Sequence, residues 1–274
     1  MSVPSEARVL VLEPDAYVSG IGAVTEGLQA LTHLAHIRID GQIRRAYVKC
    51  FPDEHHHGLC NEVLAHVLGY YLGLPQPRGA ILIVPHDLLQ AHHPATTFST
   101  GNVACWASIE AHTPSNAKHG MAKVIFQGDD LQMLAALEQW PNYPMLLAFD
   151  HWIANADRNT GNIMMVGPRA FVAIDHSAAF TGPSWVWTQL DPAKDFVNQL
   201  MDGHIRLKGL ELPLKSAILK EADELLGAYV RAMDEFDYWR AQLPLSDFLA
   251  LGNFVLRRAF EAPANLRAKT QMVA

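Results

Sequence analysis

The sequence predicts an α+β fold with a small N-terminal lobe built on a sheet and a larger, mainly helical C-terminal lobe. Short runs rich in residues that favour strands lie in the first 110 residues. Longer apolar stretches with helical spacing occupy most of the second half, as expected for a large helical lobe. At 274 residues the chain can form one large domain or two lobes that share a cleft. We place the boundary near Glu110–Pro114, which divides the chain into residues 1–110 and 111–274.

The first predicted element is a β-hairpin. Two strand-like runs, Leu34–Ile39 and Arg45–Phe51, flank Asp40-Gly41, a dipeptide that favours tight turns. Lys49 falls inside the second strand. A Lys in an apolar strand is usually an exposed edge residue, whereas in a nucleotide-binding sheet it would contact phosphates.

A helix is predicted next, from Leu59 to Leu72, because apolar residues recur at helical spacing and Pro75 follows its end. Asn61 and Glu62 lie in its first turn, where a carboxylate is also favoured by the helix dipole. The apolar run Val103–Glu110 is predicted to be a buried strand.

The most informative stretch is Asn155–Asn162, which is followed thirteen residues later by Asp175. Two apolar runs, Ile163–Val166 and Phe171–Ile174, flank the turn signal Gly167-Pro168 and predict an antiparallel hairpin. The residue before the first strand of a hairpin lies near the residue after the second, so Asn162 and Asp175 should be neighbours.

This set of side chains suits phosphoryl transfer. Asp157 can orient or deprotonate an attacking group, while Asn162 and Asp175 offer the oxygen ligands that Mg²⁺ prefers. The alternative is that Asp157–Asn162 is only a polar turn, because Asp and Asn are common loop residues. The hairpin and the following Ile-Asp favour the functional interpretation.

The motif Asn-x-Asp-Arg-x-x-x-Asn, followed by a hairpin and Ile-Asp, resembles the catalytic segment of the HipA-like kinases, especially short members that consist of the kinase domain alone. It is also similar to phosphatidylinositol 3- and 4-kinases, where an Ile-Asp element stands at the place of Ile174–Ser177. The resemblance implies a two-lobed, protein-kinase-like fold that uses ATP and Mg²⁺.

The resemblance also implies roles for individual residues. The run Arg45–Phe51 resembles the family's Lys-containing strand, so Lys49 would contact nucleotide phosphates with Glu62 as its partner. Asp157 would be catalytic, and Asn162 and Asp175 would hold Mg²⁺. Arg158 would stabilise either the loop or the transferring phosphoryl group. By position alone, residues 25–29 would cover the phosphates and the strand Val103–Glu110 would lead into an adenine-binding hinge.

Three functions remain open on this evidence. The first is an ATP-dependent kinase for Ser or Thr of a protein. The second is a pseudokinase that binds nucleotide without turnover and acts as an interaction module. The third is a lipid kinase, which no polybasic segment or basic amphipathic helix supports.

Composition indicates a soluble, cytoplasmic protein. The formal charge of −7 does not indicate binding to nucleic acid, and no run reaches the length of a membrane helix or resembles a signal peptide. Cys50, Cys60 and Cys105 have no metal-ligand spacing and sit in apolar runs, so we expect reduced, buried thiols. His55–His57 is expected in a solvated loop, and His92-His93 in another loop. Neither cluster has the ligand spacing of a metal site, so we do not expect either to bind a metal.

The remaining elements are helical. A capping Asp, proline breaks and apolar spacing predict the following helices: Asp129 or Asp130 to Trp140, Pro144–Ala154, Pro192–Ile205, Pro213–Leu243 and Leu245–Ala262.

Overall fold

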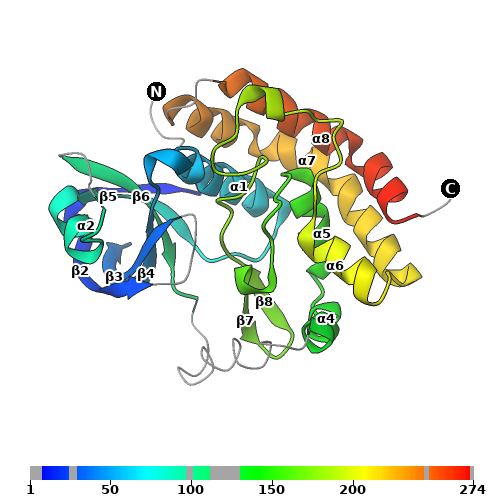
Figure 1. The fold of residues 1–274 in the computed structure, drawn as a ribbon, viewed down its shortest axis with the longest axis horizontal. Helices are drawn as coiled ribbons and strands as arrows, with labels where there is room; N and C mark the ends of the chain where they lie inside the picture. The colour runs from blue at the N-terminus through cyan, green and yellow to red at the C-terminus, as the bar shows by residue number, and fades with distance from the viewer. Residues whose placement is uncertain (1–7, 25–29, 97–100, 112–129, 244–246, 272–274) are drawn as a thin grey trace.

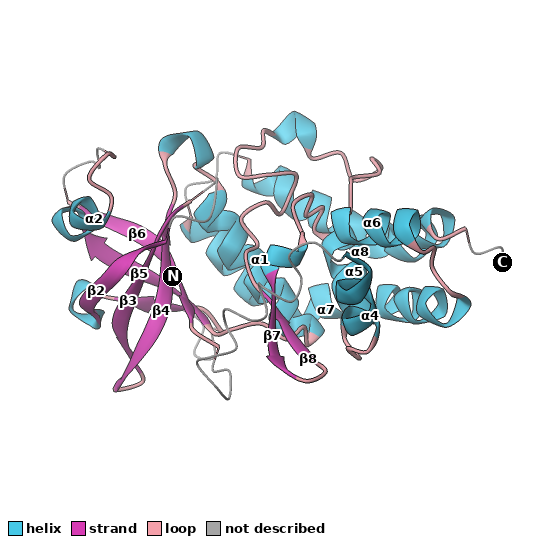
Figure 2. Cartoon of the chain, turned by 60° about the horizontal axis from the view of Figure 1, so that its bottom comes forward, coloured by secondary structure: helices cyan, strands magenta, loops and turns pink. Residues whose placement is uncertain are grey.

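The structure is a computed structural model that describes residues 8–24, 30–96, 101–111, 130–243 and 247–271 (Figure 1). A sheet lies at one end of the molecule and most helices lie at the other, as Figure 2 shows. The predicted α+β architecture is therefore confirmed.

The N-terminal sheet has six strands in the order β1-β5-β6-β4-β3-β2. β1 pairs with β5 in parallel and the other neighbours are antiparallel. The strands are β1 (Leu10–Leu12), β2 (Tyr17–Val24), β3 (Leu31–Ile39), β4 (Gln42–Cys50), β5 (Gly79–Pro85) and β6 (Asn102–Ile109). The predicted buried strand at residues 103–110 is β6.

The β3–β4 hairpin forms where the sequence predicts it. Ile39 pairs with Gln42, so that Asp40 and Gly41 make a two-residue loop. Both loop residues have positive φ, 50° and 71°, which is the backbone that a tight hairpin turn of this kind requires. Lys49 lies near the end of β4 and pairs with Thr32 of β3.

The two faces of the sheet are covered differently. One face packs a small apolar core with the helix α2 (His86–His92), which contributes Leu89. The helix α1 (Gly58–Leu72) packs near the other face and is buried nearly all round. Its residues Val63 and Leu64 share the large core with Trp152 and Phe236 of the helical part, so the hydrophobic core does not divide at residue 110. Both views place α1 between the sheet and the other helices.

The C-terminal part contains five α-helices within the described residues and one small hairpin. The helices are α4 (Asp130–Glu138), α5 (Tyr143–Trp152), α6 (Gln199–Leu207), α7 (Leu212–Gln242) and α8 (Phe248–Lys269), and the hairpin consists of β7 (Ile163–Gly167) and β8 (Ala170–Ala173). Figure 1 shows this hairpin below α1. None of the described helices is both long and apolar enough to cross a bilayer.

The predicted start of a helix at Pro192 is wrong. The carboxylate of Asp191 accepts a hydrogen bond from the backbone N–H of Ala193 at 3.0 Å and forms a turn instead of a helix cap. The true cap is Asn198, whose side-chain oxygen accepts from the N–H of Met201 at 3.0 Å, so α6 begins at Gln199.

Three other expectations need correction. α8 runs through Pro263 to Lys269 instead of ending at Ala262, because buried Leu266 continues its packing face. His57 is not solvated, since its ring stacks on buried Trp185 with centroids 3.9 Å apart. His92 lies in the last turn of α2 and not in a loop.

Candidate active site

The β7–β8 hairpin brings Asn162 and Asp175 together, as predicted. Ile163 pairs with Ala173, and the N–H of Ile174 donates to the carbonyl of Asn162 at 3.1 Å. The two ends of the hairpin therefore lie side by side, with Asn162 on one and Asp175 on the other. Asn159 shapes the approach to β7, because its side-chain oxygen accepts from the N–H of Gly161 at 2.8 Å.

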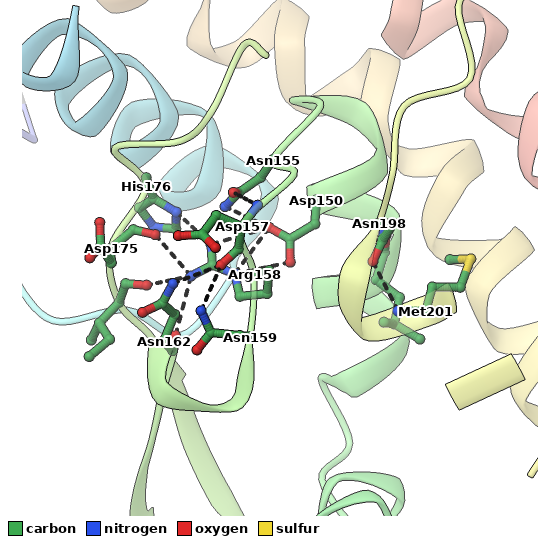
Figure 3. Close-up of polar contacts among 12 residues, drawn as sticks. Asp150, Asn155, Asp157, Arg158, Asn159, Asn162, Asp175, His176, Asn198 and Met201 are labelled. Carbon is green, nitrogen blue, oxygen red and sulfur yellow. Dashed lines mark hydrogen bonds and ion pairs between the residues drawn. The ribbon is translucent and has the colours of Figure 1, made fainter. Parts of the chain in front are cut away.

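Arg158 lies at the centre of this region (Figure 3). Its Nη1 donates to the carbonyl oxygens of Asn162 at 3.2 Å and Asp175 at 3.1 Å, and also to that of Ile174. Its Nε lies 3.0 Å from Oδ2 of Asp150 on α5. One guanidinium thus fixes the backbone of both predicted metal ligands and ties them to α5.

The geometry around Arg158 favours one of the two roles considered for it. Its side chain is fully buried beside the equally buried Asp150, and its donors are directed at protein acceptors. This arrangement holds the loop in place and does not present the guanidinium to a phosphoryl group.

Asp157 lies beside Asn162 but its carboxylate is not tied down. The Asn162 side chain donates from Nδ2 to the carbonyl of Asp157 at 2.9 Å, and the N–H of Asp157 donates to Oδ1 of Asn155 at 3.2 Å. These bonds hold the backbone of Asp157. Within the described part of the chain, its half-buried carboxylate forms no hydrogen bond or ion pair, so it can meet an incoming group.

Lys49 joins the sheet to this region. Its Nζ lies 2.7 Å from Oε1 of Glu62 and 2.8 Å from Oδ1 of Asp175. Burial alone would lower the pKa of Lys49, but the two carboxylates outweigh it and raise that pKa. Burial raises the pKa of Glu62, and Lys49 offsets this only in part. Burial would likewise raise the pKa of Asp175, but Lys49 and Ser177 hold it below its ordinary value.

The two oxygens of Asp175 have different surroundings. Oδ1 accepts from Lys49 and also from the hydroxyl of Ser177 at 2.6 Å. The residue has a positive φ of 62°, and the next N–H, from His176, donates to Oε2 of Glu62 at 2.9 Å. Glu62 therefore holds both Lys49 and the backbone that follows Asp175.

The donor set fits a small, hard cation. Nδ2 of Asn162 donates to Asp157, which leaves Oδ1 of Asn162 as one candidate metal ligand. Oδ1 of Asp175 accepts from Ser177, which leaves Oδ2 of Asp175 as the second candidate ligand. Two such oxygens are what Mg²⁺ uses when phosphates and waters complete its shell. Across the described ranges, the candidate site included, no group of three or more His, Cys, Asp or Glu side chains is arranged to hold a metal ion.

Sequence reasoning missed the role of Asn61. Its buried Nδ2 lies 2.7 Å, 2.9 Å and 2.8 Å from the carbonyl oxygens of Ser177, Ala179 and Gly182, and its Oδ1 accepts from Trp185 at 3.0 Å. Asn61 thus pins the segment after Asp175 to α1. The signal in the sequence was the Asn61-Glu62 pair, which also belongs to the family resemblance, but only Glu62 was given a role.

His176 was also missed. Arg158 can only donate, so Nδ1 of His176, 2.8 Å from its Nη2, must accept. The ring proton then sits on Nε2, which lies 3.2 Å from Oε1 of Gln76. Burial, with Arg158 beside it, holds the pKa of His176 well below its usual range.

Two further expectations on the N-terminal lobe have different outcomes. The expected phosphate-covering residues 25–29 lie outside the described residues. The strand expected to lead to the hinge is present as β6, where Trp106 pairs with Lys49, and the hinge assignment stays a prediction.

Comparison with protein families identifies the chain. A family model described as HipA-like kinase matches residues 40–191, which is more than half of the sequence. The chain therefore belongs to the HipA-like kinase family. The matched range contains Lys49, Glu62 and the whole region around Asp175.

A comparison with curated proteins finds no significant match. Among solved structures, the chain is similar to the crystal structure of the Helicobacter pylori proinflammatory kinase CtkA, with a TM-score of 0.54 and 13% sequence identity. The match covers 95% of this chain and 98% of that one. This likeness shows a kinase-like fold. The expected relation to phosphatidylinositol kinases finds no support in these comparisons.

Proposed function

We propose that the chain is an ATP- and Mg²⁺-dependent kinase that phosphorylates Ser or Thr hydroxyls of a protein. The observation that carries this proposal is the convergence of Lys49, Asn162 and Asp175, with Asp157 beside them. The family and the fold support kinase chemistry in general.

Each residue has a distinct proposed task. When bound, MgATP supplies the phosphoryl group and the metal neutralises charge on the phosphates. Asn162 and Asp175 would hold the ion through Oδ1 and Oδ2. Lys49, kept in place by Glu62, places its positive charge against the nucleotide phosphates. Asp157 orients the acceptor hydroxyl and accepts its proton.

The acceptor is proposed on charge. The chain has a formal charge of −7 and contains no cluster of four or more Lys and Arg residues. Anionic lipid attracts basic segments by about 1 kcal/mol per residue, and this chain has no such cluster to exploit that attraction. A protein hydroxyl is therefore the better supported acceptor. We also propose a cytoplasmic location, which the three free thiols support.

The first test is the thermal stability of the protein with MgATP. A ligand at a hundred times its dissociation constant adds about 2.7 kcal/mol of stability, so the melting temperature should rise. Asp175→Ala should abolish the rise, while Asp157→Ala should retain it because Asp157 addresses the acceptor. No rise in the folded wild-type protein at millimolar MgATP would overturn both the kinase and the pseudokinase.

A further inference from the structure

Two cysteines lie on neighbouring strands of the N-terminal sheet. Cys50 is the last residue of β4 and Cys105 lies within β6. Both belong to the small apolar core on one face of the sheet. Lys49 projects from the other face, because successive side chains of a strand alternate and Lys49 reaches Glu62 of α1. The pair is thus separate from the candidate active site.

The pairing of the two strands places these cysteines directly opposite each other. Lys49 pairs with Trp106 and Val48 with Ala107, so the next step along the same antiparallel register pairs Cys50 with Cys105. Directly opposed residues of an antiparallel pair project from the same face.

The spacing follows from the hydrogen-bond pattern. The N–H of Glu110 donates to the carbonyl of Arg45 at 2.9 Å, which makes these opposed residues a hydrogen-bonded pair. Hydrogen-bonded and non-hydrogen-bonded pairs alternate along the ladder, so the pair at Cys50, five residues on, is non-hydrogen-bonded. The Cα atoms of such pairs are about 4.5 Å apart, inside the range of about 4.4–6.8 Å that a disulfide spans.

The two thiols already interact. A hydrogen bond from the Cys105 thiol lowers the pKa of Cys50, and the same contact, with burial, raises the pKa of Cys105. Cys50 is therefore the thiol that ionises first and the better nucleophile, while Cys105 keeps its proton. Cys50 is the last residue of β4, so peroxide would reach the buried pair through local opening at that strand end.

We propose that Cys50 and Cys105 form a redox-active dithiol site that is oxidised by peroxide to an internal disulfide. The Cys50 thiolate attacks one peroxide oxygen, the O–O bond breaks, and the departing hydroxide takes up the proton that the Cys50 thiol released, which gives a sulfenic acid and water. The Cys105 sulfur then attacks Cys50 and the S–O bond breaks. The departing hydroxide takes the Cys105 proton and leaves as a second water. Overall, two thiols lose two hydrogens and one hydrogen peroxide becomes two waters.

The third cysteine provides a matched control. Cys60 is also free and buried, but it lies in α1 on the other side of the sheet, where burial raises the pKa of its thiol to about 12. It has neither an opposed cysteine nor a lowered pKa, and it should stay reduced.

The experiment treats the folded full-length chain with hydrogen peroxide, blocks remaining thiols with N-ethylmaleimide and maps peptides by mass spectrometry. We expect one disulfide, between Cys50 and Cys105, with Cys60 alkylated, and complete reversal by dithiothreitol. Cys60→Ala should form the same bridge, whereas Cys50→Ala and Cys105→Ala should form none.

Several results would overturn the proposal: all three thiols alkylated after treatment, a bridge that includes Cys60, sulfinic acid on Cys50 in place of a bridge, or bridging only in urea. Mapping the wild-type chain decides the matter even if a variant fails to fold. The test uses no nucleotide, so its outcome is independent of the proposed kinase activity.

Discussion

Lys49 in the N-terminal sheet and Asp175 beyond the β7–β8 hairpin form an ion pair, with Nζ and Oδ1 2.8 Å apart. The same Nζ lies 2.7 Å from Glu62 of α1. One largely buried cation therefore pairs with two carboxylates that come from different parts of the chain. This relationship connects the strand of the sheet with the residue proposed to hold the metal.

Replacing Lys49 by Met should impair both activity and folding. Phosphoryl transfer should fall at least about 100-fold, the usual effect of removing one preorganised electrostatic group. The free energy of unfolding should fall by about 3–5 kcal/mol, because buried Glu62 loses its partner. Kinetic assays and urea denaturation measure the two effects. Lys208→Met, which removes a more exposed pair with Glu138, is the control and should change stability far less. Unchanged activity in Lys49→Met would refute its proposed role.

Arg158→Lys should destabilise the candidate site although the charge is kept. A lysine ammonium cannot reach Asp150, His176 and the carbonyls of the hairpin ends in the planar arrangement that the guanidinium uses. We expect a loss of about 3–5 kcal/mol in the free energy of unfolding, measured by chemical denaturation. Arg257→Lys, at a half-exposed pair with Glu261, should cost less than about 1 kcal/mol. Equal effects of the two substitutions would show that Arg158 does not organise the site.

Stability should fall in mild acid because several histidines are buried in neutral form. Burial lowers the pKa of His66 and His57 to about 4 and that of His33 and His151 to about 3. The folded state then binds fewer protons than the unfolded state. Stability is therefore full above the unfolded pKa of about 6.5 and is lost as the pH falls toward the folded values, by about 1.4 kcal/mol per pH unit for each histidine.

His66 is the best residue for testing this pH dependence, since burial alone lowers its pKa. His66→Phe should shrink the difference in unfolding free energy between about pH 7.5 and about pH 5.5 by about 1.4 kcal/mol. An unaltered pH dependence in His66→Phe would mean that His66 does not titrate on unfolding.

Local sequence patterns predicted the parts of the site that depend on neighbouring residues. The turn signals around residues 40 and 167 set the two hairpins, and the second of these brings Asn162 to Asp175. The pairing of Lys49 with Glu62 followed from the resemblance to a family and is present in the structure.

The parts that were missed depend on tertiary packing. Asp150 looked like an ordinary residue of a predicted helix, and only the fold places it against Arg158. The contacts of Asn61 with the carbonyls after Asp175 span more than a hundred positions of sequence. The opposition of Cys50 and Cys105 requires the register of β4 against β6, which no local pattern specifies.

The most direct test of the proposed kinase is phosphate transfer from radiolabelled MgATP, with the pure protein and a mixture of candidate protein substrates. The wild-type chain should label a protein on Ser or Thr. Asp157→Asn, which keeps the size of the side chain but removes its basicity, should reduce labelling by about 100-fold or more while MgATP still raises the melting temperature. Binding of MgATP with no transfer by the wild-type chain, or full transfer by Asp157→Asn, would contradict the account.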